Sequence, residues 1–198
     1  MKKNKLLGMS LMIIGLLLPI REYLINIYMN RTKEARIVSY LKATSITNIP
    51  NESTHHEVND QRNDYIAILE IPAISLKKGL VDIANEFNDI EYNIAIMESS
   101  NLPNIKNSNL ILAAHNGNSP VSFFKDLEML GIGEHAYIYY NGYKYTYQIA
   151  NYYVVEKKGT INITRDMTKN TLTLITCKND SDTEQIVYIG YLIDQKAY

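Results

Sequence analysis

The chain has 198 residues, of which 46% are hydrophobic and 21% are charged, so it is long enough for one ordinary domain with an appendage and too apolar to be disordered throughout. A formal net charge of −1 excludes the basic footprint of a nucleic-acid-binding protein. A single cysteine excludes an intramolecular disulfide framework and a zinc site built from several cysteines.

The N-terminus predicts a membrane anchor. Lysines within residues 1–5 precede residues 6–20, which carry no charge, and Arg21 closes the run. As a helix this run spans roughly 22 Å, and snorkelling of Lys5 and Arg21 compensates for the ~30 Å hydrocarbon core. A cleaved signal peptide and a buried soluble helix are the alternatives, but no small-x-small cleavage site follows the run. We expect residues 1–21 to form a single-pass anchor with its N-terminus inside and the rest of the chain exported.

A helical stalk and a polar linker are predicted for residues 22–64. In residues 22–41 apolar positions recur at three- and four-residue steps, as on one face of a helix. Residues 43–64 are polar and contain Pro50 and many Asn, Ser, Thr and Asp residues, which is typical of a linker. The adjacent His55 and His56 lack a cysteine or an acidic cluster at ligand spacing, so we expect no metal site there.

From residue 65 the sequence changes to short strand-like runs separated by turn signals. Asn141-Gly142 between two tyrosine-rich runs is a strong hairpin signal. Brief helices are expected near residues 84–87 and 121–129. We therefore predict an all-β fold, a closed or nearly closed β-barrel over residues 65–198. The expected strands are residues 65–71, 76–81, 93–97, 110–114, 136–140, 143–156, 172–177 and 185–193.

Two residues at strand exits are candidates for chemistry. Cys177 ends an apolar run and opens into a polar turn, and His115 follows the apolar run 110–114 in the same way. A lone cysteine is usually a small buried hydrophobe, and a lone histidine is usually structural. A nucleophile and an acid/base group that both stand where a strand opens into a loop are a more specific pair, suited to thiolate attack on a carbonyl.

Three segments resemble the sortases, the cysteine transpeptidases of Gram-positive cell envelopes. Residues 173–177 (TLITC) resemble the TLxTC signature of that family. Residues 69–74 (LEIPAI) resemble its first barrel strand, and residues 110–115 with 123–127 (FFKDL) resemble its histidine strand and the helix that follows. The order and spacing agree across residues 65–193. The N-terminal anchor and the modest loop before Cys177 resemble the general-purpose (class A) or class D groups.

The resemblance implies a closed eight-stranded barrel, an extracellular catalytic domain on the cell membrane and a thioacyl mechanism. Cys177 is expected to attack the carbonyl of an LPxTG-like C-terminal sorting motif, and His115 to protonate the leaving amine. An amine from a peptidoglycan precursor or a pilin then resolves the thioacyl enzyme. No cofactor, metal or nucleic acid is expected, and the resemblance leaves calcium activation open because some members of the family use calcium.

The sequence departs from the family pattern at the position of an arginine on the strand after the cysteine. Gln185 stands there, which donates hydrogen bonds but brings no charge. Losing a charge-assisted contact to an oxyanion costs on the order of 10²–10³ in rate. Arg165, in the loop before the cysteine strand, is an alternative source of a guanidinium. Ala114, where the family often has glycine, and Thr176 are expected with Arg165 among the substrate-binding residues.

Gln185 leaves two further functions open. One is a sortase-like accessory or binding protein with attenuated catalysis, because Gln185 weakens catalysis without obstructing binding. The other is an exported cysteine hydrolase or an unrelated membrane-anchored barrel. Transfer to an amine, as opposed to hydrolysis or no reaction with sorting peptides, distinguishes the transpeptidase from both.

Overall fold

A computed structural model describes residues 20–21, 31–45 and 65–198 of the chain. The chain divides into two units, Met1–Tyr40 and Leu41–Tyr198. The predicted anchor lies outside the described residues except for Ile20 and Arg21, and most of the predicted linker also lies outside them. No helix among the described residues is both long enough and apolar enough to cross a membrane.

A helix occupies residues 31–45, within the predicted stalk. It continues past residue 41, so the prediction of linker at residues 43–45 is wrong. Hydroxyl groups in its last turns donate to the backbone of the preceding turn, Thr44 Oγ1 to the Leu41 carbonyl at 3.3 Å and Ser45 Oγ to the Lys42 carbonyl at 2.9 Å. These contacts let polar residues remain in a helix that their composition alone does not favour.

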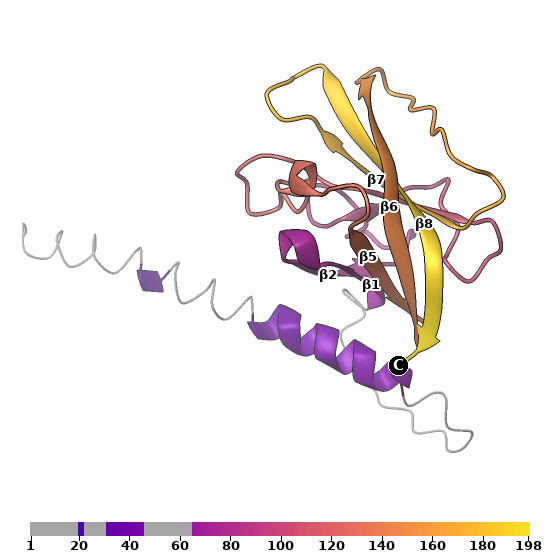
Figure 1. The fold of residues 1–198 in the computed structure, drawn as a ribbon. Coiled ribbons are helices and arrows are strands. Elements are labelled where there is room, and N and C mark those ends of the chain that lie inside the picture. Colours follow the sequence, from indigo (N-terminus) through magenta and orange to yellow (C-terminus); the bar gives the residue numbers. More distant parts are fainter. Residues whose placement is uncertain (1–19, 22–30, 46–64) are drawn as a thin grey trace, which may run out of the picture. The chain divides into compact units, whose positions relative to one another are not determined.

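Eight strands, joined by loops and two 3₁₀ turns, lie in residues 65–198 and confirm the predicted all-β fold. Asn141 and Gly142 both have positive φ, 49° and 78°, and join Tyr140 to Tyr143 in the tight hairpin that the sequence predicts. The strands are β1 (Tyr65–Ile71), β2 (Leu76–Val81), β3 (Ala95–Ile96), β4 (Asn109–Ala113), β5 (His135–Tyr140), β6 (Tyr143–Glu156), β7 (Thr171–Cys177) and β8 (Glu184–Ala197). Figure 1 shows the two long strands β6 and β8 running side by side.

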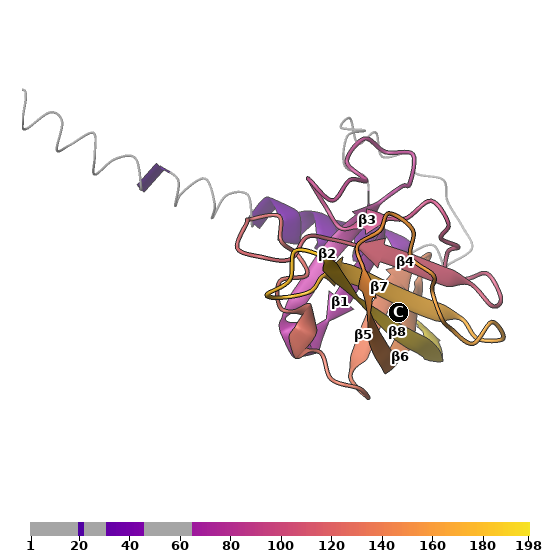
Figure 2. The ribbon, with the colours of Figure 1, turned by 90° about the horizontal axis from the view of Figure 1, so that it is seen from above.

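The strands make one sheet in the order β2-β1-β5-β6-β8-β7-β4-β3, which curls into a nearly closed barrel. Across the seam between β2 and β3, the buried Asn93 side chain donates from Nδ2 to the Gly79 carbonyl at 3.2 Å. Each pair of neighbours in this order is antiparallel except β4 and β7, which run parallel and lie side by side in Figure 2. The parallel pair is what brings the ends of the histidine and cysteine strands to the same edge.

The two faces of β4, β7 and β8 bury different side chains. The barrel interior receives one set of alternate residues, including Leu112, Leu174 and Tyr188, in a core to which most of the strands contribute. The outer face receives the other set, in a second apolar cluster built on Ile111, Ile175, Val187 and Ile189. Because side chains alternate along a strand, these two clusters show which residues of each strand point into the barrel and which point outward.

Two predicted helices differ from the structure. Residues 84–87 form turns, in which Ala84 N–H donates to Asp82 Oδ1 and Phe87 N–H donates to Asn85 Oδ1, both within 2.9 Å. These side chains offer the backbone an alternative to helical hydrogen bonds, so the prediction there is wrong. The second helix shrinks to one 3₁₀ turn, η2 (Leu127–Met129), and another 3₁₀ turn, η1 (Pro72–Ile74), follows β1.

Candidate active site

Cys177 and His115 come together at one edge of the sheet. The β4–β7 register pairs Ala113 with Ile175, so His115 and Cys177 are both the second residue beyond the same rung. The pairing continues past the end of β4, because Ala114 N–H donates to the Ile175 carbonyl at 3.3 Å. Adjacent parallel strands therefore deliver the predicted nucleophile and the predicted acid/base group side by side.

The Cys177 thiol lies on the outer face of the sheet. Ile175, two residues earlier, belongs to the outer cluster, and Cys177 is half-buried at its rim. The β6–β7 loop packs on the same cluster through Ile161 and Ile163. An apolar floor beside a partly exposed thiol suits a site that binds an extended peptide and restricts water.

Gln185 lies directly opposite Cys177. The two are register partners in the antiparallel β7–β8 pair, and Lys178 N–H donates to the Glu184 carbonyl at 3.0 Å just beyond them. This pattern marks a non-hydrogen-bonded pair, in which opposite side chains lie closest and on the same face. The structure thus brings the predicted Gln185 to the thiol, where its amide can donate hydrogen bonds without supplying charge.

Glu91 holds the ring of His115. Glu91 Oε1 is 2.9 Å from His115 Nε2, and the side chains are 66% and 33% exposed respectively. The carboxylate fixes the ring orientation, as the orienting member of a nucleophile–base–acid series does. No local sequence pattern marks Glu91, because it comes from a turn-rich loop more than twenty residues before His115.

Asn116 fastens the β7–β8 loop to the end of β4. Its Nδ2 donates to the Cys177 carbonyl at 2.9 Å and lies 2.7 Å from Asn179 Oδ1. On the other side of that loop, Asn179 N–H donates to Glu128. Asn116 directly follows His115 in the sequence, and this position is the one signal that could have identified it.

The Glu128 carboxylate also affects Tyr188, a tyrosine of the barrel core. Burial, assisted by the charge of Glu128, raises the pKa of Tyr188 to about 12. This phenol therefore stays neutral throughout the range in which a thiol and an imidazole exchange protons.

An open cavity of about 380 Å³ surrounds the exposed side of the thiol. Its wall combines the β4 exit with residues 178–182 of the β7–β8 loop, so the open side of Cys177 is mainly polar. The lining residues are Asn116, Gly117, Cys177, Lys178, Asn179, Asp180, Ser181 and Asp182.

Ala114 and Thr176 do not line this cavity. Both side chains are buried, 5% and 2% exposed, and both precede a site residue by one position, so they project into the barrel. Thr176 Oγ1 donates to the Ala114 carbonyl at 2.8 Å. The prediction that these side chains bind substrate is corrected accordingly: they tie the two strands that carry the site.

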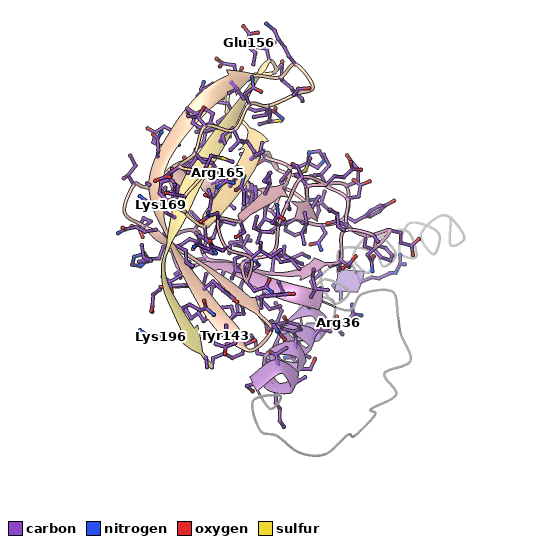
Figure 3. The ribbon with its side chains drawn as sticks, turned by 90° about the vertical axis from the view of Figure 1, so that its right-hand side faces the viewer. Arg36, Tyr143, Glu156, Arg165, Lys169 and Lys196 are labelled. Atoms are coloured by element: carbon purple, nitrogen blue, oxygen red, sulfur yellow. The ribbon has the colours of Figure 1, made fainter. Side chains whose placement is uncertain are left out.

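Arg165 lies at the other end of β7. Its guanidinium donates to the Lys169 carbonyl at 3.2 Å, the Asn107 carbonyl at 3.3 Å and Thr171 Oγ1 at 3.3 Å. Since β7 has seven residues, its ends are about 20 Å apart. Figure 3 shows Arg165 beside Lys169 and away from the tip of β6 at Glu156. The structure does not bring Arg165 to Cys177. The prediction that Arg165 supplies the guanidinium that is missing at Gln185 is therefore corrected.

A different cation reaches the thiol. Lys157, the first residue after β6, places Nζ 3.7 Å from Cys177 Sγ. The sequence analysis missed it because the pairing of β6 with β8, and of β8 with β7, positions it, and no local motif marks it. Among the described residues, no group of three or more His, Cys, Asp or Glu side chains could hold a metal ion.

Comparison with known proteins agrees with this geometry. The family model described as Sortase domain matches residues 69–193, more than half of the chain. The comparison with curated proteins found no significant match.

Solved sortase structures share the fold. A Clostridium perfringens sortase D5 transpeptidase is 22% identical with a TM-score of 0.56, covering 66% of this chain and 80% of its own. Listeria monocytogenes sortase A is 19% identical with a TM-score of 0.56, covering 69% and 92%. Streptococcus pneumoniae sortase C is 20% identical with a TM-score of 0.59, covering 82% and 88%. With the family match over the barrel and the paired Cys177 and His115, the chain belongs to the sortase family of cysteine transpeptidases.

Proposed function

We propose that this sortase cleaves an LPxTG-like C-terminal sorting motif through a thioacyl intermediate on Cys177 and transfers the acyl group to an amine of the cell wall or a pilin. The observation that carries the proposal is the placement of Cys177 and His115 at matching positions of two parallel neighbours. A nucleophile next to a general acid, beside an apolar floor and an open cavity, is what acyl transfer from a peptide requires.

In the first half-reaction the Cys177 thiolate attacks the carbonyl carbon of the scissile peptide bond. The Sγ–C bond forms and the carbonyl electron pair moves to oxygen. When that oxyanion collapses, the C–N bond breaks and the departing amine takes a proton from His115. Glu91, 2.9 Å from the ring, orients the histidine for this proton transfer.

In the second half-reaction an acceptor amine attacks the thioester carbonyl and loses a proton to His115. The C–S bond breaks, and the thiolate returns with a new amide as product. The outer apolar cluster under the site favours an amine over water by limiting hydration of the thioester.

The domain is proposed to work on the extracellular side of the cell membrane, held by residues 1–21 as an N-terminal anchor. Three lysines before an uncharged run support this orientation. The open cavity beside Cys177 supports access for both a protein substrate and an amine acceptor.

The second candidate is an accessory protein that binds sorting motifs with attenuated catalysis. Gln185 favours it, because a neutral side chain stands directly opposite Cys177. Peptide binding on the outer face does not require charge at this position, whereas oxyanion stabilisation benefits from it.

The deciding experiment mixes the full-length protein in mild detergent with a sorting-peptide library and either a diglycine or a diaminopimelate-type acceptor. Mass spectrometry detects the ligated product and the acyl adduct on Cys177. We expect product from the native chain and none from Cys177→Ala. Peptide binding without product in the native chain, with product restored in Gln185→Arg, favours the accessory protein. Hydrolysis without ligation contradicts transfer.

A further inference from the structure

The Lys157 ammonium is the cation that contacts the nucleophile of this protein. Its Nζ is 3.7 Å from Cys177 Sγ, within hydrogen-bonding distance for sulfur. The Lys157 backbone N–H donates to the Thr183 carbonyl at 2.8 Å, which continues the β6–β8 pairing one step past the last paired residues. The lysine therefore leaves the sheet from a defined position next to the site.

Strand register explains why this side chain reaches the thiol. Gln185 pairs with Cys177 on one side and with Val155 on the other, so these three residues form one row across β7, β8 and β6. Partners in a row project to the same face, and Lys157 is two residues beyond Val155. A four-carbon side chain from that position passes alongside Gln185 to the sulfur.

The neighbouring cations are engaged elsewhere. Lys158 pairs with Glu156, and Lys178 pairs with Glu184 at 3.4 Å. Arg165 donates to carbonyls at the far end of β7. Lys157 has no carboxylate partner within the part of the chain that the structure describes, so its contact with Cys177 does not compete with an ion pair.

Other charges around the thiol come from two sides. His115 stands at the end of β4, level with Cys177, and Lys178, Asp180 and Asp182 line the cavity from the β7–β8 loop. Lys178 pairs with Glu184, so the ammonium that contacts the sulfur is that of Lys157.

We propose that Lys157 is a catalytic residue that supplies, at Cys177, the positive charge that Gln185 does not. This inference rests on the proposed acyl transfer. In the resting enzyme the ammonium contacts the sulfur that attacks the substrate carbonyl. After the Sγ–C bond forms, the carbonyl electron pair resides on oxygen, and the same ammonium donates a hydrogen bond to that oxyanion. When the C–N bond breaks, the proton on the leaving amine comes from His115, so Lys157 stays protonated throughout.

The first test measures the nucleophile without any substrate. Because the chain has one cysteine, iodoacetamide alkylation of the full-length protein reports on Cys177 alone. The alkylation rate is followed by mass spectrometry from pH 5 to pH 10 in the native chain, Lys157→Met and Lys157→Arg. Lys158→Met is the matched control, since it removes the adjacent lysine, which pairs with Glu156.

We expect Lys157→Met to lower the alkylation rate at neutral pH about threefold, the size appropriate to an exposed charge contact. Lys157→Arg and Lys158→Met should stay near the native rate. An unchanged rate in Lys157→Met overturns the proposal, and so does an equal loss of rate in Lys158→Met, which would indicate a general effect of surface charge.

The second test measures transfer. With the peptide and amine assay, Lys157→Met should lower kcat by on the order of 10²-fold and leave KM within a few-fold, because the oxyanion contact exists only in the transition state. Lys157→Arg should recover most of the rate. A normal kcat in Lys157→Met overturns the oxyanion role. If the native chain transfers nothing but Lys157→Met still slows alkylation, the proposed function fails while the contact between Lys157 and the nucleophile stands.

Discussion

The two ends of β7 each lie beside a cationic side chain, and the two cations differ in what they contact. At the Thr171 end the Arg165 guanidinium donates to the Asn107 and Lys169 carbonyls, which no reaction uses. At the Cys177 end the exposed Lys157 ammonium contacts a nucleophile at 3.7 Å. Hydrogen bonds to carbonyls stabilise a loop conformation, whereas charge next to a thiol changes its reactivity. Substitutions at the two ends should therefore separate stability from activity.

The largest effect is expected at the Cys177 end. His115→Ala should lower the rate of acyl transfer roughly 10²- to 10⁴-fold, because proton delivery to the leaving amine is lost. The unfolding midpoint should stay near the native value, since the His115–Glu91 pair is open to solvent, with Glu91 66% exposed. Peptide ligation and chemical denaturation measure the two quantities. His135→Ala, at the start of β5, is the matched control. A large loss of stability in His115→Ala would contradict the idea that the two ends of β7 separate activity from stability.

The opposite outcome is expected at the Thr171 end. Arg165→Met should lower the free energy of unfolding by about 1–3 kcal/mol, because two backbone carbonyls and Thr171 Oγ1 lose a donor. Ligation measured well below the unfolding midpoint should keep its native rate. Lys106→Met, an exposed lysine beside Asn107, controls for loss of charge. If Arg165→Met lost activity while keeping native stability, the prediction would be contradicted, and Arg165 would have to act at the substrate groove.

A smaller effect is expected for the carboxylate behind the histidine. Glu91→Gln should lower kcat by about three- to tenfold, because the ring keeps a hydrogen-bond partner but loses the charge-assisted contact that orients it. Ligation kinetics with Glu86→Gln as the control, a nearby exposed glutamate, measure the difference. A faster Glu91→Gln enzyme would show that the pair holds His115 away from Cys177.

The smallest effect concerns Asp166, next to Arg165. Hydrogen bonds from the Thr168 hydroxyl and backbone, and then the charge of Lys169, hold the pKa of Asp166 below 3.8. A depressed pKa stabilises the fold above the unfolded value, and the contribution disappears as pH falls through the folded value. Thermal unfolding between pH 2.5 and pH 7 should show native and Asp166→Asn midpoints converging below about pH 4. Midpoints that stay equally separated across this range would contradict it.

Sequence patterns predicted the strands well, because most strands bury one face, and their buried residues then alternate with less buried ones along the sequence. The bounds of β1, β2 and β6 match the predicted ranges, and Asn141-Gly142 forms the predicted hairpin. β8 runs to Ala197, four residues past its predicted end. Its exposed final residues pair with the start of β6, and that pairing holds residues whose own pattern is too polar to indicate a strand.

The site was predictable where its residues stand at strand ends and not where they depend on register. Cys177 and His115 follow apolar runs, so their position indicated their role. Lys157 and Arg165 both stand in or beside the loop between β6 and β7, and neither has a local pattern that distinguishes them. Only the pairing of β6, β8 and β7 decides that Lys157 reaches the thiol and that Arg165 does not.

The parallel pairing of β4 with β7 also has a consequence for biosynthesis. The bond from Thr176 Oγ1 to the Ala114 carbonyl joins residues 62 positions apart, and β8 must then lie against β7 before Gln185 meets Cys177. Contacts this distant in sequence form slowly, after the loop-closure entropy has been overcome. A chain synthesised only as far as Cys177 has its cysteine but lacks the β8 strand that carries Gln185. Reactivity of the assembled site should thus appear only after β8 has been synthesised and has paired with β7.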